Sequence, residues 1–134
     1  MFKRIAHVGI AVKSLKEASQ RFRDLLDAKE SPSQSVSSEN VNVAMFDIGG
    51  TKVELIESND ASSTIVKFIE KRGEGIHHIS FEVDDLEKEL ARLRGKGFQV
   101  LEGYPRLGAD GFQVAFLHPK TTNGVLIELS QKAR

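Results

Sequence analysis

An internal repeat restricts the possible folds of this chain more than any other feature of its sequence. The segment HVGIAVKSLKEASQRFRDLL begins at residue 7, and the segment HISFEVDDLEKELARLRGKG begins at residue 78, an offset of 71 residues. In each copy a short strand-like run is followed directly by a run whose apolar residues have helical spacing. Each copy therefore predicts a strand that leads into a helix.

The same order of elements is predicted in both halves. Ser14, with Glu17 three residues later, forms a capping box for the first helix, and Asp84 or Asp85 can cap the second. Strand-like runs follow each helix, at 41–48 and 51–57, with a shorter run before them, and at 98–102, 112–118 and 124–130. Each half therefore reads as a βαβββ module.

Two such modules predict an α+β fold in which a curved mixed sheet surrounds a cup. The predicted organisation is a single domain, 1–134, with modules at 1–60 and 74–134 and a linking helix at 61–73. The length of 134 residues is sufficient for one hydrophobic core without disulfides or structural metals.

Composition excludes several classes of function. The chain has no cysteine, which rules out thiol catalysis, cysteine zinc sites and disulfides, and fits a reducing cytoplasm, the predicted location. A formal net charge of zero argues against a nucleic-acid or membrane-surface partner. No apolar stretch reaches the length of a membrane span, and no signal-peptide core is visible.

The repeat also pairs residues that can bind a metal. His7 corresponds to His78, and Glu54 corresponds to Glu128 at a slightly larger offset of 74 residues. Two imidazoles and two carboxylates suit Zn²⁺, Co²⁺, Mn²⁺, Ni²⁺ or Fe²⁺. Because a twofold repeat brings equivalent positions to one axis, these four residues are predicted to bind one divalent ion per chain, whose identity the sequence does not decide.

The adjacent histidines at the start of the second copy are predicted to have different roles. Side chains alternate along a strand, so His78 shares one face with Ser80 and Glu82, whereas His77 shares the apolar face. The apolar face should pack on the helices. His78 is therefore the predicted ligand, and His77 a core or supporting residue.

Several longer motifs resemble the methylmalonyl-CoA epimerase family of the vicinal-oxygen-chelate (glyoxalase/bleomycin resistance/dioxygenase) superfamily. The resemblance covers essentially the whole chain and rests on these segments: HVGIAV (7–12), GGTKVELIE (49–57), KFIEKRGEGIHHISFEVDDLE (67–87), PRLGADG (105–111) and FLHPKTTNGVLIEL (116–129). It implies a glyoxalase-like fold, a homodimer and an acyl-CoA substrate. The family's metal ligands fall on the four residues that the repeat selects: His7, Glu54, His78 and Glu128.

The resemblance also implies an activity, the interconversion of (R)- and (S)-methylmalonyl-CoA through a metal-stabilised enolate. Epimerisation needs proton transfer on both faces of the planar intermediate, and Glu128 resembles the family's base on one face. Val43 stands where some relatives carry the second base, a glutamate. The alternatives for that second group are a metal-bound water or a carboxylate of this chain: Glu39, Glu82 or Glu102.

Three further residues are predicted to contact the substrate: Ser80, Arg106 and His118. Arg106 can pair with a carboxylate or phosphate, and His118, just before a proline, has a structural role as its alternative. The alternative functions are a glyoxalase I-like lactoylglutathione lyase, a dioxygenase and a metal-free small-molecule-binding protein. The sequence does not locate the CoA phosphate subsite or settle the exact acyl-CoA preference.

Overall fold

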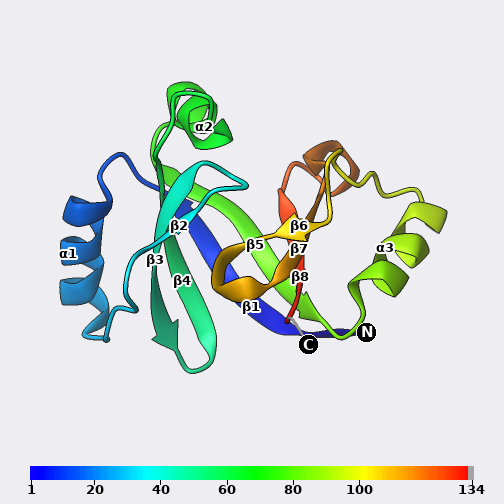
Figure 1. Cartoon of the computed structure of the whole chain (residues 1–134), viewed down its shortest axis with the longest axis horizontal. Coiled ribbons are helices and arrows are strands. Elements are labelled where there is room, and N and C mark those ends of the chain that lie inside the picture. The colour runs from blue at the N-terminus through cyan, green and yellow to red at the C-terminus, as the bar shows by residue number, and fades with distance from the viewer. Residues whose placement is uncertain (133–134) are drawn as a thin grey trace. The chain divides into compact units, whose positions relative to one another are not determined.

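The computed structural model describes residues 1–132 of the chain. Its helices and strands, in chain order, are β1 (Phe2–Ala11), α1 (Leu15–Leu26), β2 (Gln34–Val36), β3 (Val41–Ile48), β4 (Thr51–Ser58), α2 (Thr64–Arg72), β5 (Gly75–Val83), α3 (Leu86–Gly95), β6 (Arg106–Leu107), β7 (Gln113–Leu117) and β8 (Ile127–Gln131) (Figure 1). Short 3-10 helices cover Ala109–Gly111 and Pro119–Thr121. Within residues 1–132, no helix is both long and apolar enough to cross a bilayer.

The element order confirms the predicted α+β class and the two βαβββ modules. β1, α1, β2, β3 and β4 form the first module, β5, α3, β6, β7 and β8 form the second, and α2 lies in the segment predicted to link them. The strands pair in the order β2-β3-β4-β1-β5-β8-β7-β6. In each module the first strand pairs in parallel with the last, β1 with β4 and β5 with β8.

The chain separates into two compact units whose boundaries run through β1 and β5. One unit is His7–His77, and the other combines Met1–Ala6 with the chain from His78 onward. Each unit has its own apolar core.

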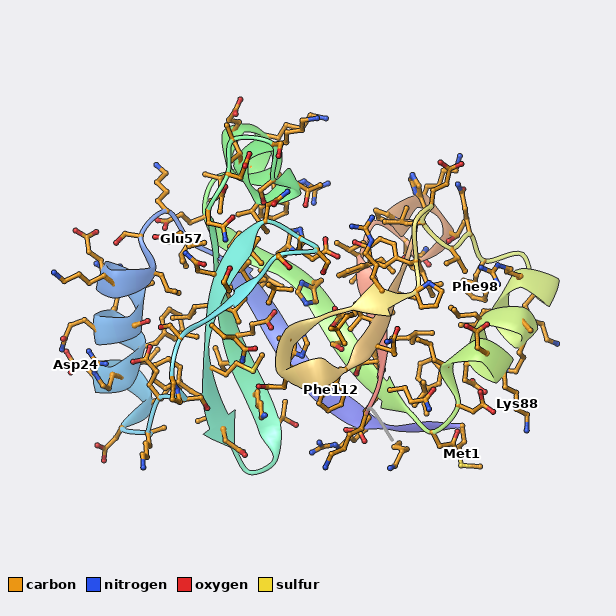
Figure 2. The ribbon with its side chains drawn as sticks, viewed as in Figure 1. Met1, Asp24, Glu57, Lys88, Phe98 and Phe112 are labelled. Carbon is orange, nitrogen blue, oxygen red and sulfur yellow. The ribbon has the colours of Figure 1, made fainter. Side chains whose placement is uncertain are left out.

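In the unit His7–His77, α1 packs against β3 and β4. Ser14 caps the helix as predicted, since its hydroxyl accepts a hydrogen bond from the Glu17 N–H at 3.2 Å. Glu57 of β4, labelled in Figure 2, also accepts the Leu15 N–H at 2.8 Å. The helix thus begins where two side chains satisfy its first free N–H groups. Its buried core cluster is Val12, Leu15, Ala18, Ala44, Phe46 and Leu55.

In the other unit, α3 packs its apolar stripe against β8 and its neighbours. Asp85, rather than Asp84, caps α3 by accepting the Lys88 N–H at 3.1 Å. Phe98, labelled in Figure 2, packs against the core from the segment after the helix. The buried residues of this core are Val83, Leu86, Leu90, Leu93, Ala115, Leu117 and Leu129. Leu86, Leu90 and Leu93 of α3 are all buried, which confirms the predicted apolar face of the helix.

The second module differs from its prediction at one strand. The predicted strand at 98–102 is wrong: Val100 forms only an isolated bridge with Leu117. The extended pairing instead falls on β6, where Arg106 pairs with Val114 and Leu107 with Gln113. The alternation of apolar residues at 98–102 reflects packing on the core, because Phe98 and Val100 both contact that cluster.

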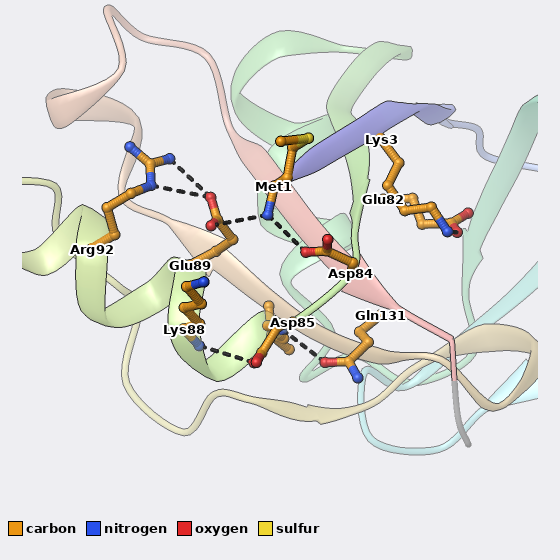
Figure 3. Close-up of polar contacts among 10 residues, drawn as sticks. Met1, Lys3, Glu82, Asp84, Asp85, Lys88, Glu89, Arg92 and Gln131 are labelled. Atoms are coloured by element: carbon orange, nitrogen blue, oxygen red, sulfur yellow. Dashed lines mark hydrogen bonds and ion pairs between the residues drawn. The ribbon is translucent and has the colours of Figure 1, made fainter.

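The amino end of β1 is held against the start of α3. The Met1 ammonium donates to Asp84 Oδ1 at 2.7 Å and to Glu89 Oε2 at 3.2 Å (Figure 3). Arg92, one turn further along α3, donates to the other oxygen of Glu89 at 3.0 and 3.1 Å. Asp84 and Glu89 together raise the pKa of the ammonium. This network holds the first residues of β1 to α3 within the unit that contains both.

Candidate metal centre

The first histidine–glutamate pair is formed by two parallel strands of the unit His7–His77. In the register of β1 and β4, Glu54 lies opposite Gly9, two residues after His7 on the same face of β1. Gly9 has no side chain, so the position opposite Glu54 carries no group of its own. His7 Nε2 lies 3.5 Å from Glu54 Oε1, and the glutamate is only 5% exposed.

The second pair repeats this arrangement on β5 and β8. Glu128 lies opposite Ser80, again two residues after the histidine. His78 Nε2 is 3.8 Å from Glu128 Oε1, and both side chains are buried. The equivalence of the two pairs follows from the same parallel register in each module.

Three of the four predicted ligands form a group that can hold a metal ion. One ligand atom from each of His7, Glu54 and His78 lies within 4.8 Å of the others. Two neutral imidazoles and a buried carboxylate are a donor set suited to Zn²⁺, Co²⁺, Mn²⁺ or Ni²⁺. Glu128 does not belong to this group of three, but its carboxylate lies beside one member of the group, His78.

The structure gives the neighbouring histidines different surroundings, as predicted. His77 is half-buried, and its ring meets the edge of Phe68 of α2 at a centroid distance of 4.9 Å. His78 is 4% exposed and faces the opposite side of β5. A contact with an apolar helix residue gives His77 a packing role.

An aromatic series leads from His78 to Arg106. The His78 ring meets Phe116 edge-on at 5.5 Å, and Phe116 meets Tyr104 at 5.2 Å. The Arg106 guanidinium stacks over Tyr104 at 4.3 Å and donates to the Gly103 carbonyl at 3.0 Å. Phe116 lies near the site because it pairs with Glu128 in the register of β7 and β8. Such a pairing between strands is not visible in the sequence, so sequence reasoning does not find Phe116 or Tyr104. Contact of Arg106 with a substrate stays a prediction.

His118 has a structural contact. Its Nδ1 accepts the Lys120 N–H at 3.1 Å and so caps the short helix Pro119–Thr121. The half-buried imidazole therefore supports the turn between β7 and β8. A role in substrate binding would use its other nitrogen and stays a prediction.

Glu82, one of the candidates for the second base, is held in an ion pair. Arg4 donates to Glu82 Oε1 from Nε and Nη2 at 3.1 and 2.9 Å, and Lys3 Nζ lies 3.5 Å from Oε2 (Figure 3 shows Lys3 and Glu82). Burial raises the pKa of Glu82, but the hydrogen bond from Arg4 and the charges of Arg4 and Lys3 outweigh it. The net pKa lies below its usual value. A carboxylate stabilised in this way is a weaker base.

This ion pair makes a prediction about stability and pH. The pKa of Glu82 is lower in the folded state than its ordinary value of 4.5. Ionised Glu82 therefore adds to the free energy of unfolding above pH 4.5, and this contribution is lost as the pH falls through the folded-state pKa. Glu82→Gln should reduce the free energy of unfolding at pH 7 by about 1–3 kcal/mol, and the difference should shrink in acid. Chemical denaturation at several pH values measures both effects.

A matched control is Glu70→Gln, at an exposed position of α2. It should change the free energy of unfolding by no more than about 0.5 kcal/mol at any of these pH values. A Glu82→Gln difference that stays constant from neutral to acid pH would contradict the ionic origin of the effect.

Comparisons with known proteins agree with the geometry of the site. The profile of the Glyoxalase/Bleomycin resistance protein/Dioxygenase superfamily matches residues 6–116, which include His7, Glu54 and His78. The chain belongs to this superfamily. The fold of this superfamily member is accordingly glyoxalase-like, as the sequence resemblance predicted.

Relatives of this superfamily member include named epimerases. An ethylmalonyl-CoA/methylmalonyl-CoA epimerase of Cereibacter sphaeroides is 41% identical, over 98% of this chain and 99% of its own length. An uncharacterized Bacillus subtilis protein, YqjC, is also 41% identical, over 96% of this chain and 91% of its own. A Streptomyces coelicolor methylmalonyl-CoA epimerase variant in complex with 2-nitronate-propionyl-CoA is 34% identical, with a TM-score of 0.94 and complete coverage of both chains. This superfamily member is thus related to enzymes that act on acyl-CoA thioesters.

Proposed function

We propose that this protein is a metal-dependent epimerase that interconverts (R)- and (S)-methylmalonyl-CoA. The observation that carries the proposal is the group of His7 with the buried Glu54 and His78, together with the Glu128 carboxylate beside His78. The relatives named as methylmalonyl-CoA epimerases, which match nearly the full chain, support the choice of reaction.

In this proposal, residues of the chain would hold the ion and move the proton. His7, Glu54 and His78 would hold the ion, with Glu128 at its edge. A bound divalent ion supplies a Lewis acid for the negative charge that develops when the proton α to the thioester is removed. Glu128 would take that proton from one face, since a buried carboxylate beside the ion lies within reach of a substrate held there.

Epimerisation also requires a second group that transfers a proton on the opposite face of the planar intermediate. Val43, where some relatives carry a glutamate, is 2% exposed and pairs with Gln34 and Ile56, so this position offers no proton-transfer group. Glu82 is committed to Arg4. Glu39 and Glu102 remain candidates, together with a water molecule.

The proposal also covers substrate and assembly. The C. sphaeroides relative is named for both ethylmalonyl-CoA and methylmalonyl-CoA, so both thioesters are candidate substrates. We further propose, from the family resemblance, a homodimer that works in the cytoplasm. Sedimentation of the purified protein checks the dimer.

The experiment that tests the function is α-proton exchange of methylmalonyl-CoA in D₂O. Metal-loaded protein should exchange the proton rapidly, and prior treatment with EDTA should abolish the exchange. The control substrate is the methylglyoxal–glutathione hemithioacetal, which should not react. Turnover of the hemithioacetal without exchange of methylmalonyl-CoA would favour the glyoxalase I-like function. Failure to bind any divalent ion would favour a metal-free binding protein.

A further inference from the structure

Ser80 is a buried hydroxyl next to the candidate metal centre, and nothing in the described chain satisfies it. It lies two residues after His78 on the same face of β5, opposite Glu128 in the parallel pair of β5 and β8. Ser80 is 0% exposed, and its Oγ has no hydrogen-bond partner among residues 1–132. Buried hydroxyls without a partner are uncommon and destabilising, so such a group points to a partner acquired in the working state.

The internal repeat allows Ser80 to be compared with the equivalent position of the first module. The equivalent position in the first module is Gly9, which lies opposite Glu54 just as Ser80 lies opposite Glu128. The two carboxylates therefore have the same register, but the residue opposite Glu54 is a glycine, whereas the residue opposite Glu128 carries a hydroxyl. This difference distinguishes the carboxylate proposed as a base from the carboxylate proposed as a ligand alone.

We propose that Ser80 is a positioning residue for Glu128, whose carboxylate accepts the Ser80 O–H when the ion is bound. This inference rests on the proposed function, in which Glu128 lies at the metal's edge. In this structure Glu128 Oε1 lies 3.8 Å from His78 Nε2, and Glu128 is outside the group of three ligands. A carboxylate that ligates a metal is oriented by hydrogen bonds from its neighbours, and Ser80 is the hydroxyl placed to supply one.

The test is metal affinity, which does not depend on turnover. Ser80→Ala should weaken Mn²⁺ binding, measured by competition with a chromophoric chelator, about 10- to 100-fold. Its metal-free melting temperature should equal or exceed that of the wild type, because the variant removes an unsatisfied buried hydroxyl. Ser80→Thr keeps the hydroxyl and should restore the affinity. The visible absorption of the Co²⁺-loaded protein should change in Ser80→Ala and return in Ser80→Thr.

Ser130→Ala is the matched control. Ser130 is also a buried serine, two residues after Glu128 on the same face of β8, but its hydroxyl donates to the Phe81 carbonyl at 3.5 Å. This variant should lower the metal-free melting temperature and leave the Mn²⁺ affinity unchanged. If Ser130→Ala weakened Mn²⁺ binding as much as Ser80→Ala, the effect would come from packing and the proposal would be overturned.

Two other outcomes separate this inference from the proposed function. Wild-type affinity and an unchanged Co²⁺ spectrum in Ser80→Ala would overturn the role of Ser80 while leaving the proposed epimerase intact. A wild-type protein that binds Mn²⁺ but does not exchange methylmalonyl-CoA would overturn the proposed reaction, and the affinity comparison would still decide the role of Ser80. A wild-type protein that binds no divalent ion would overturn both.

Discussion

His78→Ala should abolish both metal binding and α-proton exchange, whereas His77→Ala should leave both close to wild type. The two histidines are adjacent in sequence but face opposite sides of β5. His78 belongs to the group of three candidate ligands, and His77 contacts Phe68 of α2. We expect the affinity of His78→Ala for Co²⁺ or Mn²⁺ to fall by more than about 100-fold, because even the loss of a residue that merely orients a ligand costs 10- to 100-fold.

The measurement is equilibrium dialysis with metal analysis, followed by exchange of methylmalonyl-CoA in D₂O. Because His78 is buried against Phe116, the thermal unfolding of the metal-free variant must be compared with the wild type. His7→Ala is a second test with less disturbance of packing, since the His7 side chain is 14% exposed. Normal metal content in His7→Ala and His78→Ala, or loss of metal in His77→Ala, would show that the site is assigned to the wrong residues.

Glu128→Gln should separate metal binding from proton transfer. The amide keeps the volume of the side chain and one oxygen, but it cannot accept the α-proton. We expect exchange to fall about 10²- to 10⁴-fold, the usual contribution of a general base. The variant should still bind metal, because His7, Glu54 and His78 remain and the amide oxygen can take the place of the Glu128 carboxylate oxygen at the edge of the ion.

The matched comparison is Glu54→Gln. Glu54 has the equivalent position in the first module, and the amide oxygen of glutamine at this position should still serve as a ligand. Glu54→Gln should therefore retain much more exchange than Glu128→Gln, although both changes remove one negative charge beside the ion. Exchange at a near-normal rate in metal-loaded Glu128→Gln would eliminate Glu128 as the base.

Much of the candidate site could be predicted because the repeat shows which positions of the two modules are equivalent. A single histidine in a strand carries little information, but His7 and His78 occupy equivalent positions, as do Glu54 and Glu128. Strand alternation then separated His78 from His77, and in the structure His78 belongs to the group of candidate ligands, whereas His77 contacts Phe68. These inferences depend on spacing within one strand or between two copies, which a sequence records directly.

The strand predicted at 98–102 shows where this reasoning fails. Alternating apolar residues indicate a half-buried extended segment, but pairing depends on a partner edge that is free at the same place. Leu117 meets Val100 in a single bridge, while β6 takes the next part of the β7 edge. How far each of these two segments pairs with β7 is decided by tertiary packing and is not encoded in local alternation.

The sequence by itself determined the βαβββ order of the modules, the capping of α1 and the identity of the paired histidines and glutamates, because periodicity and spacing are local properties. Only the tertiary structure decided that Ser80 lies opposite Glu128 and Gly9 opposite Glu54, that Arg4 neutralises Glu82, and that Phe116 packs on His78. The physical reason is strand register. Contacts between strands that are distant in sequence depend on the register in which the strands pair, and that register is set by burying the apolar faces and forming the ion pairs at the same time.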